Sequence, residues 1–236
     1  MLERTIKNEK ILKIVYNKHM NITILKMTDA YEYQSFYKSQ KNLIIKDFRE
    51  LEGTRCYLDD AAKSTITESI KDCPVDGIHF IDSGNYHYLS LLWLSMIDEP
   101  FNLVLFDHHP DNQPPSFGSI TSCGGWVLES QETLPHLNNV YTYGVGQEIP
   151  PKSIPNDLPI YISIDKDVLS TEYAITDWDQ GDMTLPTMIS MLKDIFHNHK
   201  IIGVDICGDS SEEASSGAEI NNLTNETLFD FLCANF

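Results

Sequence analysis

The chain has 236 residues, a net charge of −18 and 42% hydrophobic residues. This length suits one domain with a substantial core, and the apolar content is too high for a disordered chain. The acidic charge excludes a nucleic-acid partner, because phosphate binding needs clustered Lys and Arg. We also expect no membrane association, since no apolar run approaches the roughly 18 residues that span a bilayer.

The cysteine pattern predicts free thiols. The five cysteines are widely spaced and include no Cys-x-x-Cys pair, so the pattern indicates neither a disulfide framework nor a structural zinc site. Residues 1–20 have charges scattered through them and do not resemble a secretory signal. We therefore expect a protein of the reducing cytoplasm.

The chain is predicted to consist of an N-terminal extension and one domain. Residues 1–20 are rich in Lys and Arg, unlike the acidic remainder, and we expect no function there. Residues 21–236 alternate short apolar runs with longer amphipathic stretches. The predicted strands cover residues 22–25, 78–82, 103–107, 140–145, 160–165 and 201–205. The predicted helices cover residues 59–71, 86–97, 125–131, 184–197 and 224–234.

This alternation predicts an α/β fold with a mostly parallel sheet covered by helices on both faces. In such a sheet, ligands bind in the crevice beyond the carboxyl ends of the strands. Capping side chains mark two of the helix starts: Asp59 and Asp60 for the first helix, and the run at residues 224–227 for the last.

Acidic side chains follow three of the predicted strands. They lie at residues 107–111 (DHHPD), at residues 165–167 (DKD) and at Asp205, and a fourth strand is followed by His87. Asp is common in ordinary turns, but here the acids adjoin apolar strands that should be buried. Carboxylates gathered near a core repel one another and lose hydration, and a divalent cation compensates for both.

The spacing predicts a site for two metal ions. Alternate side chains of an extended segment point to one side, so Asp107, His109 and Asp111 can converge, and Asp165 with Asp167 repeats the pattern. With His87 these make six ligands, which exceed the needs of one ion. Oxygen donors with imidazole suit manganese better than a thiolate-rich zinc site does.

The ordered motifs resemble those of the arginase/agmatinase (ureohydrolase) superfamily. They are residues 84–87 (GNYH), 107–111 (DHHPD) and 163–167 (SIDKD). The resemblance implies a three-layer α/β/α fold, two Mn²⁺ ions on the six ligands, and a metal-bridging hydroxide that cleaves a C–N bond of a guanidine or amidine. It further implies that Asp111 and His109 are catalytic as well as metal-binding, that the substrate is small and cationic, and that a homo-oligomer is compatible with the fold.

The sequence departs from the family at two places. Cys123 stands where a proton-shuttling histidine is usual, so we name it as a catalytic candidate, although a small residue at a Gly-rich turn would also suit the position. Gly208 stands where an acid usually holds the guanidinium, with Asp209 one residue beyond. Asp209, Trp178 and Asp182 are therefore the predicted substrate-binding residues.

Two other functions stay open from the sequence. The first is a deacetylase-like amide hydrolase with a single Zn²⁺, a class suggested by the adjacent His108 and His109. That class also needs a separate His-His pair, and this chain has none outside residues 107–111. The second is a non-catalytic, metal-stabilised binding protein, because the usual shuttle histidine and guanidinium acid are missing. Metal stoichiometry separates these readings from the dimetal hydrolase.

Overall fold

A computed structural model describes residues 20–41, 43–115, 117–145, 150–211 and 216–236. The predicted N-terminal extension therefore lies outside the described residues, apart from Met20. The chain builds a seven-stranded sheet in the order β2-β1-β4-β9-β8-β5-β7, and all of its strand pairs are parallel. The strands are β1 (Ile22–Lys26), β2 (Leu43–Asp47), β4 (Ile78–Phe80), β5 (Phe101–Phe106), β7 (Leu137–Tyr143), β8 (Ile160–Asp165) and β9 (Ile201–Cys207).

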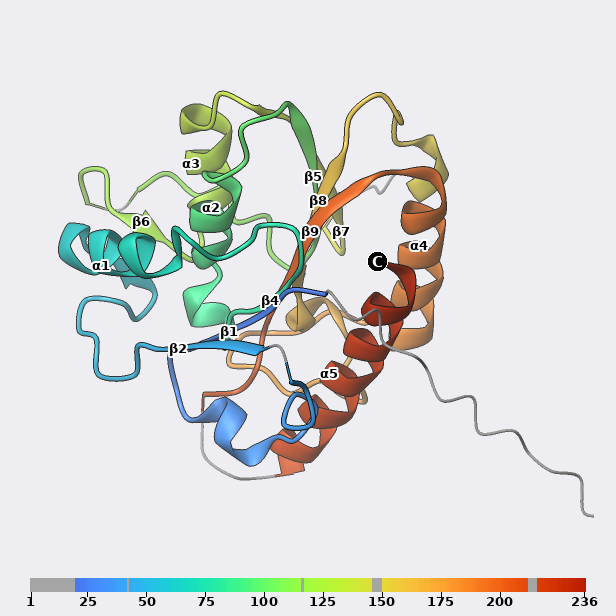
Figure 1. Cartoon of the computed structure of the whole chain (residues 1–236), viewed down its shortest axis with the longest axis horizontal. Coiled ribbons are helices and arrows are strands. Elements are labelled where there is room, and N and C mark those ends of the chain that lie inside the picture. Colours follow the sequence, from blue (N-terminus) through green and yellow to red (C-terminus); the bar gives the residue numbers. More distant parts are fainter. Residues whose placement is uncertain (1–19, 42, 116, 146–149, 212–215) are drawn as a thin grey trace, which may run out of the picture.

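Helices cover both faces of the sheet, as Figure 1 shows. One face carries α1 (Asp60–Ile70), α2 (Leu89–Leu94) and α3 (Trp126–Thr133), and the other carries α4 (Leu185–Asn198) and α5 (Ser216–Asn235). Each interface has its own cluster of buried apolar side chains. The predicted three-layer α/β/α architecture is confirmed.

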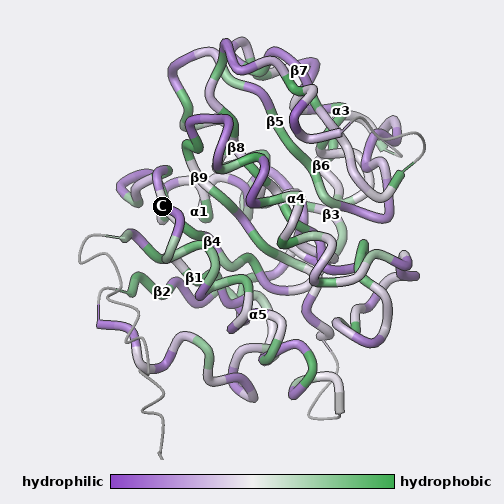
Figure 2. The backbone as a smooth tube through the Cα atoms, turned by 90° about the vertical axis from the view of Figure 1, so that its right-hand side faces the viewer, coloured by the Kyte–Doolittle hydropathy of each residue, from purple (hydrophilic) through white to green (hydrophobic). Residues whose placement is uncertain are grey.

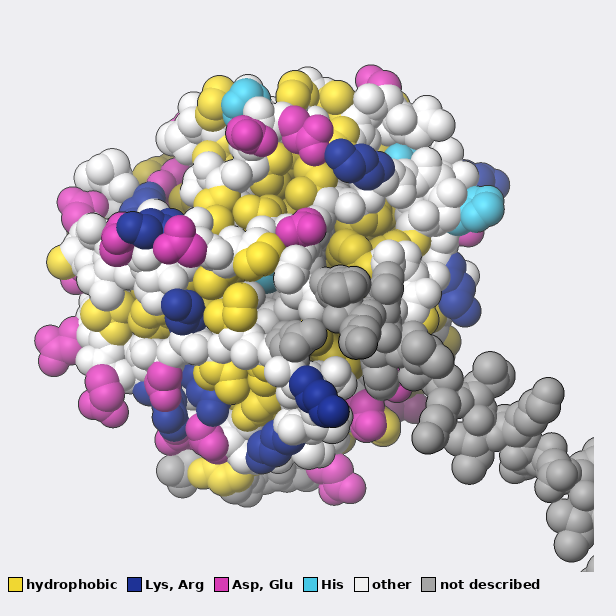
Figure 3. Space-filling model, in the orientation of Figure 1, with side chains coloured by type: hydrophobic (Ala, Val, Ile, Leu, Met, Phe, Trp, Pro, Cys, Tyr) yellow, Lys and Arg dark blue, Asp and Glu magenta, His cyan; other side chains and the backbone are white. Residues whose placement is uncertain are grey.

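Burial explains why the central strands read as continuous apolar runs. Every residue of β5 and of β8 is buried, since helices cover both faces. Figure 2 shows these strands as hydrophobic segments inside a more hydrophilic outer layer. On the face shown in Figure 3, Lys and Arg side chains lie in small separate groups among acidic ones.

All six predicted strands are present, but three further strands were missed. The edge strand β2 is only half-buried, so its apolar pattern is weak. The other two, β3 (Tyr57–Leu58) and β6 (Thr121–Ser122), form a two-residue antiparallel ladder whose partners are far apart in sequence. Such pairing leaves no local signal for a sequence pattern to detect.

The helix ends were predicted with mixed success. Asp59 caps α1 as predicted, accepting a hydrogen bond from the Ala62 backbone N–H at 2.8 Å. The predicted helix 86–97 is instead a short 3-10 turn, η2 (Gly84–Tyr86), followed by α2. The last helix begins at Ser216, so the predicted start at Thr224 was wrong. The Thr224 hydroxyl donates to the Tyr173 carbonyl across the fold rather than capping a helix.

No helix among the described residues is long and apolar enough to cross a membrane.

Candidate metal centre

The six predicted metal ligands lie together at the carboxyl end of the sheet. Asp107 follows β5 directly, Asp165 ends β8, and these two strands are paired neighbours. Asp167 lies in the 3-10 turn η4 (Lys166–Val168), and His87 is the residue that ends η2. The parallel arrangement brings these strand ends to one edge, as the sequence predicted.

One group of donors surrounds His87. Its Nδ1 atom lies 3.1 Å from Asp111 Oδ2, 3.2 Å from Asp107 Oδ2 and 3.5 Å from Asp165 Oδ2. His87, Asp107 and Asp111 are all buried, and their ligand atoms are close enough to hold one metal ion.

A second group shares Asp107 with the first. His109 Nδ1 lies 2.8 Å from Asp167 Oδ2 and 3.7 Å from Asp107 Oδ1, and these three residues also satisfy the geometry of a metal site. Asp107 Oδ2 is buried and has no hydrogen-bond partner among the described residues. This carboxylate lies between the two donor groups, and one of its buried oxygens has no hydrogen bond. Both features fit a ligand that is shared by two cations.

The backbone orients two of the carboxylates, Asp107 and Asp165, by donating a hydrogen bond to one oxygen of each. The His109 N–H donates to Asp107 Oδ1 at 2.6 Å, and the Asp167 N–H donates to Asp165 Oδ1 at 2.9 Å. The segment after β5 is a bend, with Asp111 at φ +43°, and the Asp165–Asp167 segment is a 3-10 turn. The side chains therefore converge through turns, and the predicted extended geometry was wrong.

Neighbouring side chains hold two of the candidate ligands in place. His87 Nε2 lies 2.9 Å from Ser163 Oγ, which in turn donates to Asp205 Oδ1 at 2.6 Å. Trp126 Nε1 donates to Asp111 Oδ2 at 2.7 Å. Such contacts fix the orientation of a ligand, and on the histidine they also fix the tautomer. Sequence reasoning missed the roles of Ser163, Asp205 and Trp126, because all three depend on tertiary contacts.

The titration behaviour reflects an excess of negative charge. Burial and the neighbouring Asp167 raise the pKa of Asp165 to about 7, and burial also raises the pKa of Asp111 and of Asp167. The neighbouring carboxylates of Asp107 and Asp167 raise the pKa of His109 to about 11. Burial opposes a charge on His87, yet the surrounding acidic groups raise its pKa well above the usual range. A divalent cation would supply the positive charge that protons otherwise provide here.

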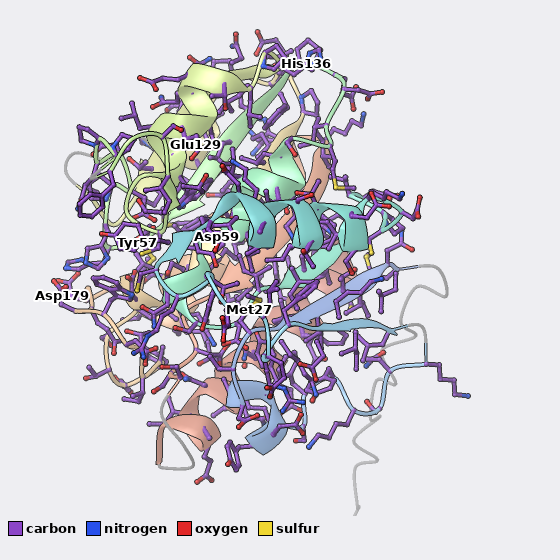
Figure 4. All side chains as sticks on the ribbon, turned by 90° about the vertical axis from the view of Figure 1, so that its left-hand side faces the viewer. Met27, Tyr57, Asp59, Glu129, His136 and Asp179 are labelled. Atoms are coloured by element: carbon purple, nitrogen blue, oxygen red, sulfur yellow. The ribbon has the colours of Figure 1, made fainter. Side chains whose placement is uncertain are left out.

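A cavity opens above the two donor groups. Its floor includes Asp107, Asp165 and Asp167, and its walls include Tyr57, which is 41% exposed, and Trp178, which is 42% exposed. The Trp178 ring lies across that of His109, with ring centroids 6.0 Å apart. Figure 4 shows Tyr57 and Asp179 at the same edge of the molecule, and the Asp179 carboxylate lies 3.1 Å from His109 Nε2. Trp178 therefore forms part of the wall of this cavity.

Cys123 also lines this cavity, beside Cys56. The two cysteines adjoin the β3–β6 ladder, and the Cys123 N–H donates to the Cys56 carbonyl at 2.9 Å. Burial raises the pKa of Cys123 to about 12, so its side chain is a neutral thiol near neutral pH. Cys123 therefore lines the cavity as a neutral thiol, which is not the protonation state of a general base.

Asp209 does not line the cavity, contrary to its predicted contact with substrate. It is fully buried, and its carboxylate forms an ion pair with Lys166 Nζ at 2.8 Å. The side chains of Gln34 and Asn225 donate to Asp209 Oδ1 at 2.7 and 3.2 Å. A carboxylate that is already paired in this way is not available to hold a substrate cation.

Asp182 is also absent from the cavity lining. It lies in a separate hollow with His108, Gly181 and Met183. Of the three predicted substrate-binding residues, the structure therefore places only Trp178 beside the donor groups.

Comparisons with known proteins place this geometry in a family. No family model matches the chain. An uncharacterized protein of Thermotoga maritima is 32% identical over 202 residues, which are 80% of this chain and 80% of that protein, so the two belong to one family.

Solved structures share the fold at low sequence identity. Arginase from Medicago truncatula has a TM-score of 0.64 at 15% identity and covers 91% of this chain and 87% of its own. Proclavaminate amidinohydrolase from Streptomyces clavuligerus has a TM-score of 0.63 at 12% identity, covering 93% and 92%. A putative agmatinase from Clostridium difficile has a TM-score of 0.63 at 14% identity, covering 92% and 96%.

The chain has the arginase/agmatinase (ureohydrolase) fold. The fold that the motif order implied is thereby confirmed, and the six candidate ligands lie together at the carboxyl end of its sheet. In this ureohydrolase-fold chain, Gly208 has φ +86°, and a Cβ atom there would lie 2.3 Å from Asp165 Oδ1. The position that the family resemblance assigns to a guanidinium-binding acid therefore has no room for a side chain.

Proposed function

We propose that this protein is a dimanganese hydrolase that cleaves a C–N bond of a guanidine or amidine compound. The observation that carries the proposal is the pair of donor groups sharing Asp107 at the floor of a cavity. Both groups consist of carboxylates and imidazole, which suit manganese. The ureohydrolase fold supports the reaction class.

The six ligands divide between two positions. His87, Asp107, Asp111 and Asp165 would hold one ion, and Asp107, His109 and Asp167 the other, following the distances from His87 Nδ1 and His109 Nδ1. When bound, two such ions supply Lewis-acid polarisation and make water a nucleophile at neutral pH.

The residues of the chain would bind and orient the substrate. Trp178 and Tyr57 provide aromatic walls for its apolar part, and Asp111, held by Trp126, provides a fixed hydrogen-bond acceptor in the cavity. The neutral thiol of Cys123 can donate a hydrogen bond but is poorly suited to accept a proton. We place the protein in the cytoplasm, in keeping with its five free thiols.

The first test is metal content measured by mass spectrometry on protein purified with manganese. The wild type should carry about two ions per chain. His109→Asn should lose one of them, whereas His136→Asn should lose none. His136 immediately precedes β7 and pairs with the first residue of β5, at the end of the sheet opposite the donor groups. The metal-loaded wild type should then release urea or ammonia from at least one compound in a panel of guanidines and amidines. A wild type that binds no metal when purified with manganese would contradict the proposal.

The pairing of Asp209 with Lys166 favours a second candidate, an amide hydrolase with a single Zn²⁺. Such an enzyme needs no acid to hold a guanidinium, and this cavity has no Asp209 carboxylate in its wall. One ion per chain, with release of a carboxylate and an amine rather than urea, would select this candidate.

A further inference from the structure

Cys207, the last residue of β9, has a role that the six-ligand scheme does not include. Its thiol is fully buried and donates to Asp165 Oδ2 at 3.1 Å. Cys207 Sγ, Asp165 and a ring nitrogen of His87 all lie within 4.8 Å of one another, which is the geometry of a third potential metal-binding group.

The sheet register explains this position. Asp165 of β8 and Cys207 of β9 are paired across the ladder, as are Ser163 and Asp205 two residues earlier. Residues two apart on a strand face the same side, so these two pairs lie one above the other. The Ser163–Asp205 pair contacts His87 Nε2, and the Asp165–Cys207 pair lies on the side of the ring that carries the carboxylates.

The next residue keeps the thiol close. Gly208 follows Cys207 with φ +86°, and the space for its Cβ is filled by Asp165 Oδ1 and the Lys166 backbone nitrogen, at 2.3 and 2.7 Å. The end of β9 is therefore packed directly against the Asp165 carboxylate. A larger residue at 208 would push the end of β9, and the thiol with it, away from Asp165.

We propose that Cys207 is a sulfur ligand of the metal position beside His87, which makes that position selective for a thiophilic divalent ion. Coordination forms a metal–sulfur bond and releases the thiol proton to solvent. The position beside His109 has only oxygen and nitrogen donors in its group. Thiolate favours zinc or cobalt over manganese, so the two positions differ in metal preference. The inference rests on the proposed function in requiring that a divalent ion binds beside His87, and it changes that proposal at one point: manganese binds there only when no thiophilic ion competes for the position.

Cobalt provides a direct test, because a cobalt–thiolate bond gives a near-ultraviolet charge-transfer band. The metal-free wild type is titrated with Co²⁺ while absorbance and bound cobalt are both measured. We expect the band to develop with the first equivalent, to disappear in Cys207→Ser, and to persist in Cys123→Ser and Cys233→Ser. Cys123 lines the same cavity, and Cys233 is a buried cysteine of α5, so the two controls separate Cys207 from other thiols.

Metal competition gives the second readout. In wild type, zinc should displace manganese from the position beside His87, and Cys207→Ser should reduce this preference by at least about tenfold. Bound cobalt without the band, a band that persists in Cys207→Ser, or no cobalt binding overturns the inference. Manganese-dependent release of urea or ammonia is measured separately. The proposed hydrolase activity can therefore be confirmed even if Cys207 proves not to bind the metal.

Discussion

At the scale of single residues, the site depends on how the candidate ligands are held. The contact of His87 Nε2 with Ser163 turns Nδ1 toward three carboxylates, and Asp205 accepts a hydrogen bond from the serine hydroxyl. Ser163 therefore determines the tautomer and the aim of a ligand without touching the metal position itself.

Replacing Ser163 with alanine should weaken metal binding. We expect Ser163→Ala to reduce manganese affinity at the position beside His87 by about 10- to 100-fold, measured by calorimetric titration. Ser95→Ala is the matched control, because the Ser95 hydroxyl also donates a hydrogen bond, at 2.7 Å to the Leu92 carbonyl, but lies outside the candidate site. Equal affinities for the two variants would show that Ser163 does not position His87.

At the scale of elements, one buried ion pair joins four segments. Lys166 of η4 pairs with Asp209 after β9, and Asp209 also accepts from Gln34, which follows the 3-10 turn η1 (Ala30–Tyr33), and from Asn225 of α5. This network connects the turn that carries Asp167 to the helix α5. Removing one partner of a buried ion pair leaves an uncompensated buried charge, which lowers the free energy of unfolding.

Breaking this ion pair should destabilise the protein strongly. Lys166→Met leaves the Asp209 carboxylate buried without its partner, so we expect a loss of about 3–5 kcal/mol in the free energy of unfolding. Removing both charges in Lys166→Met/Asp209→Leu should recover much of that loss. Urea denaturation measures both, and a double variant no more stable than the single one would contradict this account.

The close approach of β9 to Asp165 gives a second prediction at this scale. Gly208→Ala adds a clash with Asp165 Oδ1 to the strain of φ +86°, whereas Gly118→Ala at φ +56° meets no described atom within 4 Å. Both variants carry the backbone cost of about 1–2 kcal/mol, and only Gly208→Ala should also lose metal affinity. Thermal unfolding with and without manganese separates the two effects.

At the scale of the whole molecule, folding gathers acidic groups that are far apart in the unfolded chain. The pKa of Asp165 rises to about 7 in the fold, so this group stabilises the metal-free protein below about pH 4 and loses that contribution by pH 7. The pKa of His109 rises to about 11, so its contribution is complete below about pH 6.5 and is lost as pH rises toward 11. Both groups make the metal-free protein less stable as pH rises.

Metal binding should reverse this trend, because metal ligands must be deprotonated. The difference in Tm between manganese-loaded and chelator-treated protein should therefore increase from pH 5 to pH 8. At a free metal concentration of 100 times Kd the gain is about 2.7 kcal/mol, and each kcal/mol raises Tm by about 2–4 °C in a chain of this size. A difference that is constant with pH, measured by scanning calorimetry, would argue against ligation by these groups.

Much of the site was predictable because its signals are local. A buried parallel strand is a short apolar run, and an acid at its end is visible in the same segment, as with Asp107 after β5 and Asp165 at the end of β8. The N-cap of α1 at Asp59 is equally local. The missed strand β2 and the wrong start of α5 show the limit, since edge exposure and contacts such as Thr224 to Tyr173 are set by the fold.

The α/β class, the central strands and the six candidate ligands could all be predicted without the structure, because periodicity and strand-end chemistry act over a few residues. The tertiary structure decided which acids face the cavity. Asp209 points inward because a distant lysine neutralises it, and Cys207 lies beside Asp165 because β8 and β9 are neighbours in the sheet. Pairing between strands and between opposite charges joins residues remote along the chain, so no local pattern records it.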